Sequence, residues 1–334
     1  MIKRFLVVAA AALVMSCGSS ETDVVVDQKA TIEVSGIFSG NVTQTQYLRP
    51  NKQAVLTTVR MSSPTVTADT SVTQENRTVL RLDKGVMWLL PPGDDTSYVE
   101  MPLAMIRGNF ERMRQQFAEL DTSAGATPGI KLFDNSHWEL TVNDSVEQKT
   151  INGFPCQRME MIITGISDQL ATDSVLLRAD IWYSSDFPQA EFIVRETRAV
   201  VDALGVDPNW LVNILMSFVG QLGHAFTDLS DELNQLDGVP IQTSLVLEAS
   251  TAVDPTAPTA DSLARQDMVS VVVGLARMYA MATGLPAPIG HFRILAMDSE
   301  VTSIRSESLD STRFEIPANL VKQEMPGVPG GVTP

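Results

Sequence analysis

This 334-residue chain has two cysteines and three histidines, the residue types that most often act as nucleophiles, metal ligands or acid–base groups. Cys156 lies in the segment NGFPCQRMEM, where a reactive thiol would need a cationic or helix N-terminal neighbour that lowers its pKa. A second segment, GVPIQTSLV, begins at Gly238 and repeats the frame Gly-x-Pro-x-Gln with Ile241 at the cysteine position. Because isoleucine stands there, we predict that this position takes an apolar group within a sheet and that Cys156 fills space.

The histidines give no recognisable site. His137, His224 and His291 are far apart, and the pair His224 and Asp228 on a predicted helix supplies at most half of the ligands of a metal site. The chain has no zinc-protease, nucleophile-elbow or phosphate-loop motif. The sequence therefore predicts a non-enzymatic protein without metal or cofactor. An enzyme whose site is assembled from distant residues stays open as an alternative.

The first residues predict export. Lys3 and Arg4 precede an apolar run over residues 5–15, which is too short to span a bilayer and is typical of a signal peptide. The run leads into VMSCGSS, which resembles the lipobox of bacterial lipoproteins. The resemblance implies cleavage before Cys17 and its acylation, for example with palmitate, and Gly18 in place of aspartate implies the outer membrane. An ordinary leader with a chance cysteine is the alternative.

The charge of the chain restricts its partners. The formal net charge is −16, and it becomes −18 once the leader with Lys3 and Arg4 is removed. Such acidity disfavours electrostatic binding of nucleic acid or of anionic lipid headgroups. With Cys17 acylated, one thiol remains, so no intramolecular disulfide can form. We expect the membrane, through the acylated cysteine, and an apolar ligand as partners, with any protein partner unidentified.

Alternating apolar and polar residues predict an antiparallel meander. Short turns at residues 83–85, 91–95 and Asn152-Gly153 favour pairing between consecutive strands, because these residue types suit tight turns. The strands are predicted over residues 31–38, 54–61, 77–101 (as a meander), 138–144, 156–164, 175–185, 190–200, 241–249, 291–309 and 312–320.

Apolar residues at helical spacing predict three helices. The first has the stripe Leu103, Ile106, Phe110, Met113, Phe117 and Leu120. The second begins at Asp207-Pro208 and has the stripe Leu211, Ile214, Leu215, Phe218, Leu222, Phe226, Leu229, Leu233 and Leu236. The third, about 263–283, is apolar on more than one face, which favours burial on two sides over insertion into a membrane or binding to a partner.

Five segments resemble a known family: VLRLDKGVMWLLPPGDDTSYVEMPL, INGFPCQRMEM, ADIWYSSDFPQ, GVPIQTSLV and FEIPANL. They are similar to an uncharacterised, DUF4412-like family of periplasmic lipoproteins, which is related in turn to the lipoprotein-carrier (LolA/LolB-like) half-barrels. The likeness covers most of residues 30–250 and the last strands. It implies an α+β fold, a strongly curved antiparallel sheet wrapping helices, with an apolar concave face that has room for an acyl chain. Residues 250–290 depart from the family pattern and are expected to form a helical insertion.

The sequence thus predicts a lipoprotein anchored in the outer membrane, facing the periplasm, that binds a lipid or the acyl chain of another lipoprotein. A structural or interaction lipoprotein with a filled core and a protein partner is the alternative. The expected organisation is a signal peptide (1–16), a lipidated tether (17–28), one domain (29–322) and a disordered tail (323–334). The expected ligand-binding residues are Leu103, Ile106, Phe110, Met113, Phe117, Leu211, Leu215, Phe218, Leu222 and Phe226.

Overall fold

The computed structural model describes residues 23–35, 38–62, 72–90, 96–122, 136–168, 172–204, 238–252, 269, 273–274 and 289–323. Within these ranges, twelve strands form one open sheet. Their order is β12-β6-β5-β4-β3-β2-β1-β11-β10-β9-β8-β7, and every neighbouring pair is antiparallel except β12 with β6. The strands are β1 (Val24–Val34), β2 (Phe38–Arg49), β3 (Lys52–Ser62), β4 (Val72–Arg81), β5 (Val86–Leu90), β6 (Ser97–Pro102), β7 (Ser136–Ile151), β8 (Phe154–Ser167), β9 (Ser174–Ser184), β10 (Val239–Thr251), β11 (Gly290–Ser306) and β12 (Val321–Gln323).

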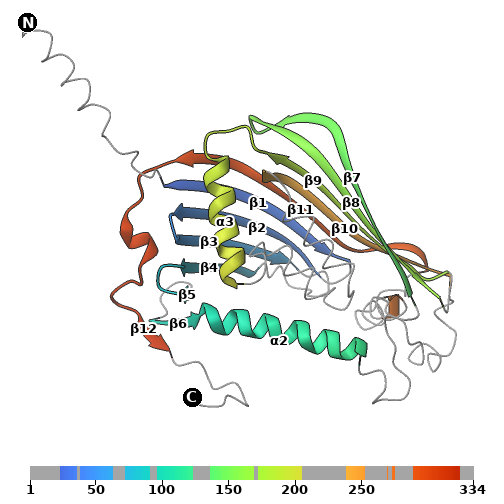
Figure 1. The fold of residues 1–334 in the computed structure, drawn as a ribbon, viewed down its shortest axis with the longest axis horizontal. Coiled ribbons are helices and arrows are strands. Elements are labelled where there is room, and N and C mark those ends of the chain that lie inside the picture. The colour runs from blue at the N-terminus through green and yellow to red at the C-terminus, as the bar shows by residue number, and fades with distance from the viewer. Residues whose placement is uncertain are drawn as a thin grey trace, which may run out of the picture.

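The sheet curves around the side on which two helices lie (Figure 1). Helix α2 (Leu103–Thr122) contacts β6 and α3 (Ala190–Leu204), and α3 also contacts β10. We call the side of the sheet that faces these helices the concave face and the opposite side the outer face. The predicted fold class, an α+β half-barrel of curved antiparallel sheet, is confirmed.

The tight turns agree with the sequence. Asn152 and Gly153 both have positive φ, 51° and 89°, which is the backbone that a two-residue hairpin turn between β7 and β8 requires. The two Gly-x-Pro-x-Gln segments open β8 and β10, which flank β9 on either side. Cys156 and Ile241 are each 1% exposed and lie in one apolar cluster. The prediction that this position takes an apolar group is confirmed.

Three predicted boundaries or elements are wrong. Residues 190–200 form α3 and not a strand, because Ala190, Ile193 and Val200 are buried at helical spacing. Residues 312–320 contain a short 3₁₀ helix, η2 (Ser311–Phe314), in place of a strand, and pairing resumes only at β12. The expected tether ends early, since β1 begins at Val24 and its first valines are buried.

A close glycine–tryptophan contact gives the first testable prediction. Gly165 on β8 lies opposite Trp138 on β7, and a Cβ at residue 165 would sit 2.4 Å from the indole ring. Gly165→Ala is therefore expected to displace the ring and to lower the free energy of unfolding by about 1–3 kcal/mol. Urea denaturation followed by tryptophan fluorescence measures it. Gly108→Ala in α2, where nothing lies within 4 Å, is the control and should be neutral or stabilising.

Candidate functional site

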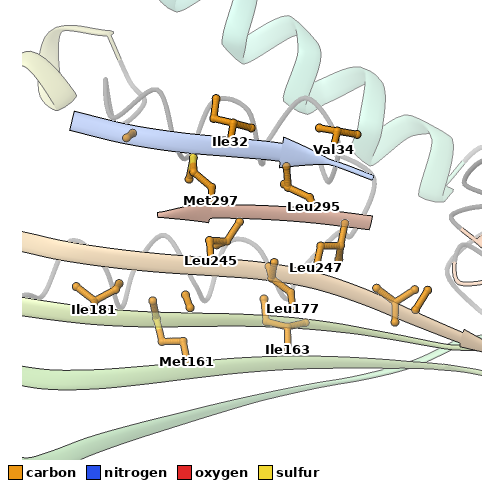
Figure 2. Packing of buried hydrophobic residues seen from close by; sticks show 14 of the residues in the cluster. Ile32, Val34, Met161, Ile163, Leu177, Ile181, Leu245, Leu247, Leu295 and Met297 are labelled. Atoms are coloured by element: carbon orange, nitrogen blue, oxygen red, sulfur yellow. The ribbon is translucent and has the colours of Figure 1, made fainter. Parts of the chain in front are cut away.

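The concave face carries a continuous apolar surface over five neighbouring strands, β1, β11, β10, β9 and β8 (Figure 2). Side chains at alternate positions of a strand point to the same face, so cross-strand partners line up in rows. One row runs through Met161, Ala179, Leu245, Met297 and Ile32. The adjacent row runs through Ile163, Leu177, Leu247, Leu295 and Val34.

These two rows, which we call the apolar rows, contain no polar side chain, and none of their residues is more than 8% exposed. Four steps between strands of about 4.8 Å make each row about 19 Å long. Half of the hydrocarbon core of a bilayer is about 15 Å thick, which is the depth that one acyl chain fills. The apolar rows therefore match an acyl chain in length and in chemistry.

Within the described residues, two helical valines cover part of this surface. Val269 and Val273 are helical, are 0% and 2% exposed, and belong to the same apolar cluster as the rows. Both come from the segment predicted as the third helix, so its predicted helical state and burial are confirmed at these positions. Val269 and Val273 thus pack against the concave face.

The apolar surface ends at a polar margin on the same face. Gln44 on β2, Thr57 on β3 and Asn76 on β4 are direct cross-strand neighbours and are half-buried. They continue the side of the sheet on which Val42 joins the apolar cluster. Uncharged amide and hydroxyl groups thus border the apolar rows, and these groups can both donate and accept hydrogen bonds.

The predicted ligand-binding residues lie only partly within the described chain. Leu103 and Ile106 pack with Leu80, Val200 and Leu204 where α2 meets α3, away from the apolar rows. Phe110 is half-buried on α2. The side chains of Met113 and Phe117, and all of Leu211, Leu215, Phe218, Leu222 and Phe226, lie outside the described residues, so their role stays a prediction.

Sequence reasoning did not propose the strand residues of the apolar rows as a site. Their signal was the strict alternation in β8, β9 and β10, which was used to predict strands. Alternation shows that one face of a strand is apolar. It cannot show whether helical residues of the same chain, such as Val269, or a second sheet packs on that face.

Cys156 has the environment of a packing residue. Its thiol donates a hydrogen bond to the Phe154 carbonyl over 3.3 Å. Burial raises the pKa of the thiol, and the Ile151 backbone and the Lys149 charge oppose this with smaller effects. A raised pKa leaves little thiolate at neutral pH, and the thiolate is the reactive form.

A thiol-specific probe should therefore label Cys156 on the native protein at least a hundredfold more slowly than after unfolding in urea, since the thiol is both buried and protonated. Following the labelling by mass over time, with Cys17→Ser present to leave one thiol, measures this. Labelling within minutes under native conditions would contradict the packing role.

Metal ligands do not cluster in the part of the chain that the structure describes: no three histidine, cysteine or carboxylate side chains are placed to hold an ion. The same residues include no helix that is long and apolar enough to cross a membrane.

No protein-family model and no curated protein matches the chain. Among solved structures, it is similar to a LolA superfamily protein from Nitrosomonas europaea, with 8% identity, a TM-score of 0.24, and coverage of 89% of this chain and 91% of that one. It is also similar to a DUF1329 family protein from Desulfovibrio piger, with 8% identity, a TM-score of 0.19, and coverage of 92% and 95%. These likenesses assign neither a ligand nor an activity, and membership of a DUF4412-like family stays a prediction.

Proposed function

We propose that the protein is an outer-membrane lipoprotein, anchored through acylated Cys17 and facing the periplasm, whose apolar rows bind an acyl chain of a lipid or of another lipoprotein. The observation that supports this proposal is the pair of unbroken rows, each of five apolar side chains. They lie on a face that helices α2 and α3 contact only in part. An acyl chain lying across the strands would bury the same groups that Val269 and Val273 bury now.

The polar margin gives the bound molecule an orientation. A lipid has an apolar chain and a polar headgroup, and the concave face has the apolar rows beside Gln44, Thr57 and Asn76. The chain of the ligand would lie on the rows, and its ester or headgroup oxygens would accept hydrogen bonds from the amide groups of the margin.

A ligand can bind the apolar rows only where Val269 and Val273 do not occupy them. Because the rows are buried in the structure, a ligand must displace Val269 and Val273 from them. Binding then costs the free energy with which these residues dock. The apparent affinity is the intrinsic affinity multiplied by the fraction of molecules in which they are detached. The two valines would act as an internal competitor for the ligand.

A second candidate function rests on the same burial. A concave face that is closed by its own chain also suits a solid scaffold, an interaction lipoprotein that holds no ligand. In that case Val269 and Val273 are a permanent part of the core and are not exchanged for a ligand.

Native mass spectrometry separates the two functions. The Cys17→Ser chain, purified without detergent, is expected to carry a phospholipid or fatty acid that is lost on unfolding, or to take up one equivalent of added palmitate. A mass without ligand and without uptake at any palmitate concentration below its micellar range would reject acyl-chain binding and leave the scaffold.

A further inference from the structure

The last part of the chain runs beside one end of the strands, from β11 to β12 (Figure 1). This C-terminal segment, residues 307–323, contains η2 and β12, and its residues Leu309 and Phe314 pack on Val25, Ala54 and Val79. Val25 alternates along β1 with Val24, which lies in the cluster of α3, so the two sets occupy opposite faces of the sheet. The segment is therefore remote from the apolar rows.

A cavity of about 290 Å³ lies between this segment and the sheet. Its lining includes Tyr47, Ala54 and Leu56 from β2 and β3, Arg77 from β4, and Thr312 and Arg313 from η2. Leu56 is 38% exposed, which makes it one of the more exposed large apolar side chains of the described residues. The cavity thus joins an apolar wall to two guanidinium groups. Its volume is near the lower end of ligand pockets, roughly 300–1,000 Å³.

Arg77 differs from the other arginines that are shielded from solvent. In the described ranges, four arginines are buried or half-buried, and three of them hold carboxylates: Arg49 binds Asp23, Arg81 binds Asp83 and Glu315, and Arg158 binds Asp180. Arg77 forms no ion pair there. Its Nη2 atom donates to the carbonyl oxygens of Thr312, over 3.4 Å, and of Arg313, over 2.7 Å.

The second guanidinium is close to the first. Arg313 lies over the ring of Tyr47, with its Cζ atom 4.4 Å from the ring centre. Two carboxylates are near this group in sequence. Glu315 forms ion pairs with Arg81 and Lys84, and the Asp310 side chain accepts a hydrogen bond from the Thr312 backbone over 2.9 Å. Burial lowers the pKa of Arg77 and the charge of Arg313 lowers it further, yet a guanidinium remains charged at neutral pH.

Shielded charges are normally paired, yet half-buried Arg77 has no carboxylate partner in the described residues, and the exposed Arg313 adds a second positive charge near it. The Nε and Nη1 groups of Arg77 and the whole fork of Arg313 have no hydrogen-bond partner within the described residues. Guanidinium forks bind carboxylate and phosphate oxygens in a bidentate manner, and a phosphate can accept from two forks at once.

We propose that Arg77 and Arg313 form a binding site for a phosphate ester carried on an apolar chain, with the phosphate between the two guanidinium groups and the first part of the chain against Leu56 and Ala54. The ester is either the headgroup of a membrane phospholipid or a free alkyl phosphate. The site is on the outer face and does not depend on acyl-chain binding in the concavity.

Isothermal titration calorimetry of the full chain carrying Cys17→Ser, with hexyl phosphate as the probe, tests the site. We expect saturable binding of one equivalent, at least tenfold tighter than for inorganic phosphate or hexanol alone. Arg313→Gln should weaken it at least tenfold without disturbing the fold, since the Arg313 side chain is exposed and lies over the Tyr47 ring. Arg77→Gln should weaken it at least as much.

The matched control is Arg60→Gln, an exposed arginine on the outer face of β3, four residues from Leu56 and outside the cavity. It removes the same charge and should change the affinity less than twofold. Binding of phosphatidylglycerol vesicles, absent with phosphatidylcholine and lost in Arg313→Gln, would identify the membrane headgroup as the source. Binding of hexyl phosphate alone would identify a free ester. No saturable binding, or equal losses in Arg60→Gln and Arg313→Gln, would overturn the proposal.

Discussion

Val269→Asp is expected to raise the affinity for palmitate about tenfold while the sheet stays folded. The side chain of Val269 is fully buried against the apolar rows, and a carboxylate cannot remain there without a cost of several kcal/mol. Undocking removes this cost, and the burial of Val273 that is lost with it, about 1.5–3 kcal/mol, offsets part of the gain. A free-energy change of about 1.4 kcal/mol in favour of the detached state corresponds to a tenfold gain in apparent affinity.

Competition of palmitate with a fluorescent fatty acid measures this affinity, and far-UV circular dichroism reports the sheet. Ile289→Asp is the control, because Ile289 is 56% exposed beside β11 and a carboxylate there needs no rearrangement. Loss of the folded sheet in Val269→Asp without any gain in affinity would favour the scaffold, in which Val269 belongs to a single cooperative core.

Asp23→Ala is expected to lower the free energy of unfolding by about 3 kcal/mol at neutral pH. The Asp23 carboxylate accepts hydrogen bonds from Nε and Nη2 of Arg49, over 2.8 and 2.6 Å, and from the buried Leu309 backbone N–H over 2.8 Å. It therefore joins the start of β1 to the end of β2 and to the C-terminal segment. Its removal leaves the Arg49 guanidinium and the Leu309 N–H without this carboxylate acceptor. The loss of such a shared acceptor lowers the free energy of unfolding by about 3 kcal/mol.

The pH dependence of this contribution has a defined sign. Burial by itself would raise the pKa of Asp23, but the hydrogen bonds from Arg49 and Leu309 outweigh it and hold the pKa below the ordinary value of 3.8. A carboxyl with a lowered folded pKa stabilises the protein above its unfolded pKa and loses that contribution as the pH falls through the folded value. The difference between the native chain and Asp23→Ala should be constant from about pH 5 to 8 and shrink below pH 3.8.

Urea denaturation at several pH values gives these differences. Asp298→Ala, which removes an exposed carboxylate from β11, is the control and should change the stability by less than about 0.5 kcal/mol. A difference for Asp23→Ala that grows in acid would contradict the assigned role of the carboxylate.

The sequence was most informative where a few adjacent residues decide the backbone. The Asn152-Gly153 turn and the short turn ending at Gly85, which has a φ of 66°, follow from residue type alone. Residues 190–200 were misassigned because the segment AEFIV suits a strand over its first residues, while the helical period only emerges with Val200 and Leu204. The predicted strand at 312–320 is replaced from Ser311 by η2, which Asp310 caps, and Pro317 has no N–H for a ladder further along.

The sites depend on contacts that no local pattern contains. Leu245, Met297 and Ile32 become one row only through the pairing of β10, β11 and β1, which brings residues over 250 positions apart side by side. Arg77 and Arg313 are likewise 236 positions apart, and each alone resembles an ordinary surface arginine. Strand register and the path of the C-terminal segment, which create both sites, are properties of the folded chain.

Photo-crosslinking can show whether an acyl chain lies on the apolar rows. The Cys17→Ser chain is irradiated with a palmitate analogue that carries a diazirine near its methyl end, and the labelled peptides are identified by mass spectrometry. Saturable labels are expected on β8, β10 and β11, at or beside Met161, Leu245 and Met297. Excess palmitate should remove these labels. Labels confined to the outer face around Leu56, or labels that excess palmitate leaves unchanged, would contradict binding to the apolar rows.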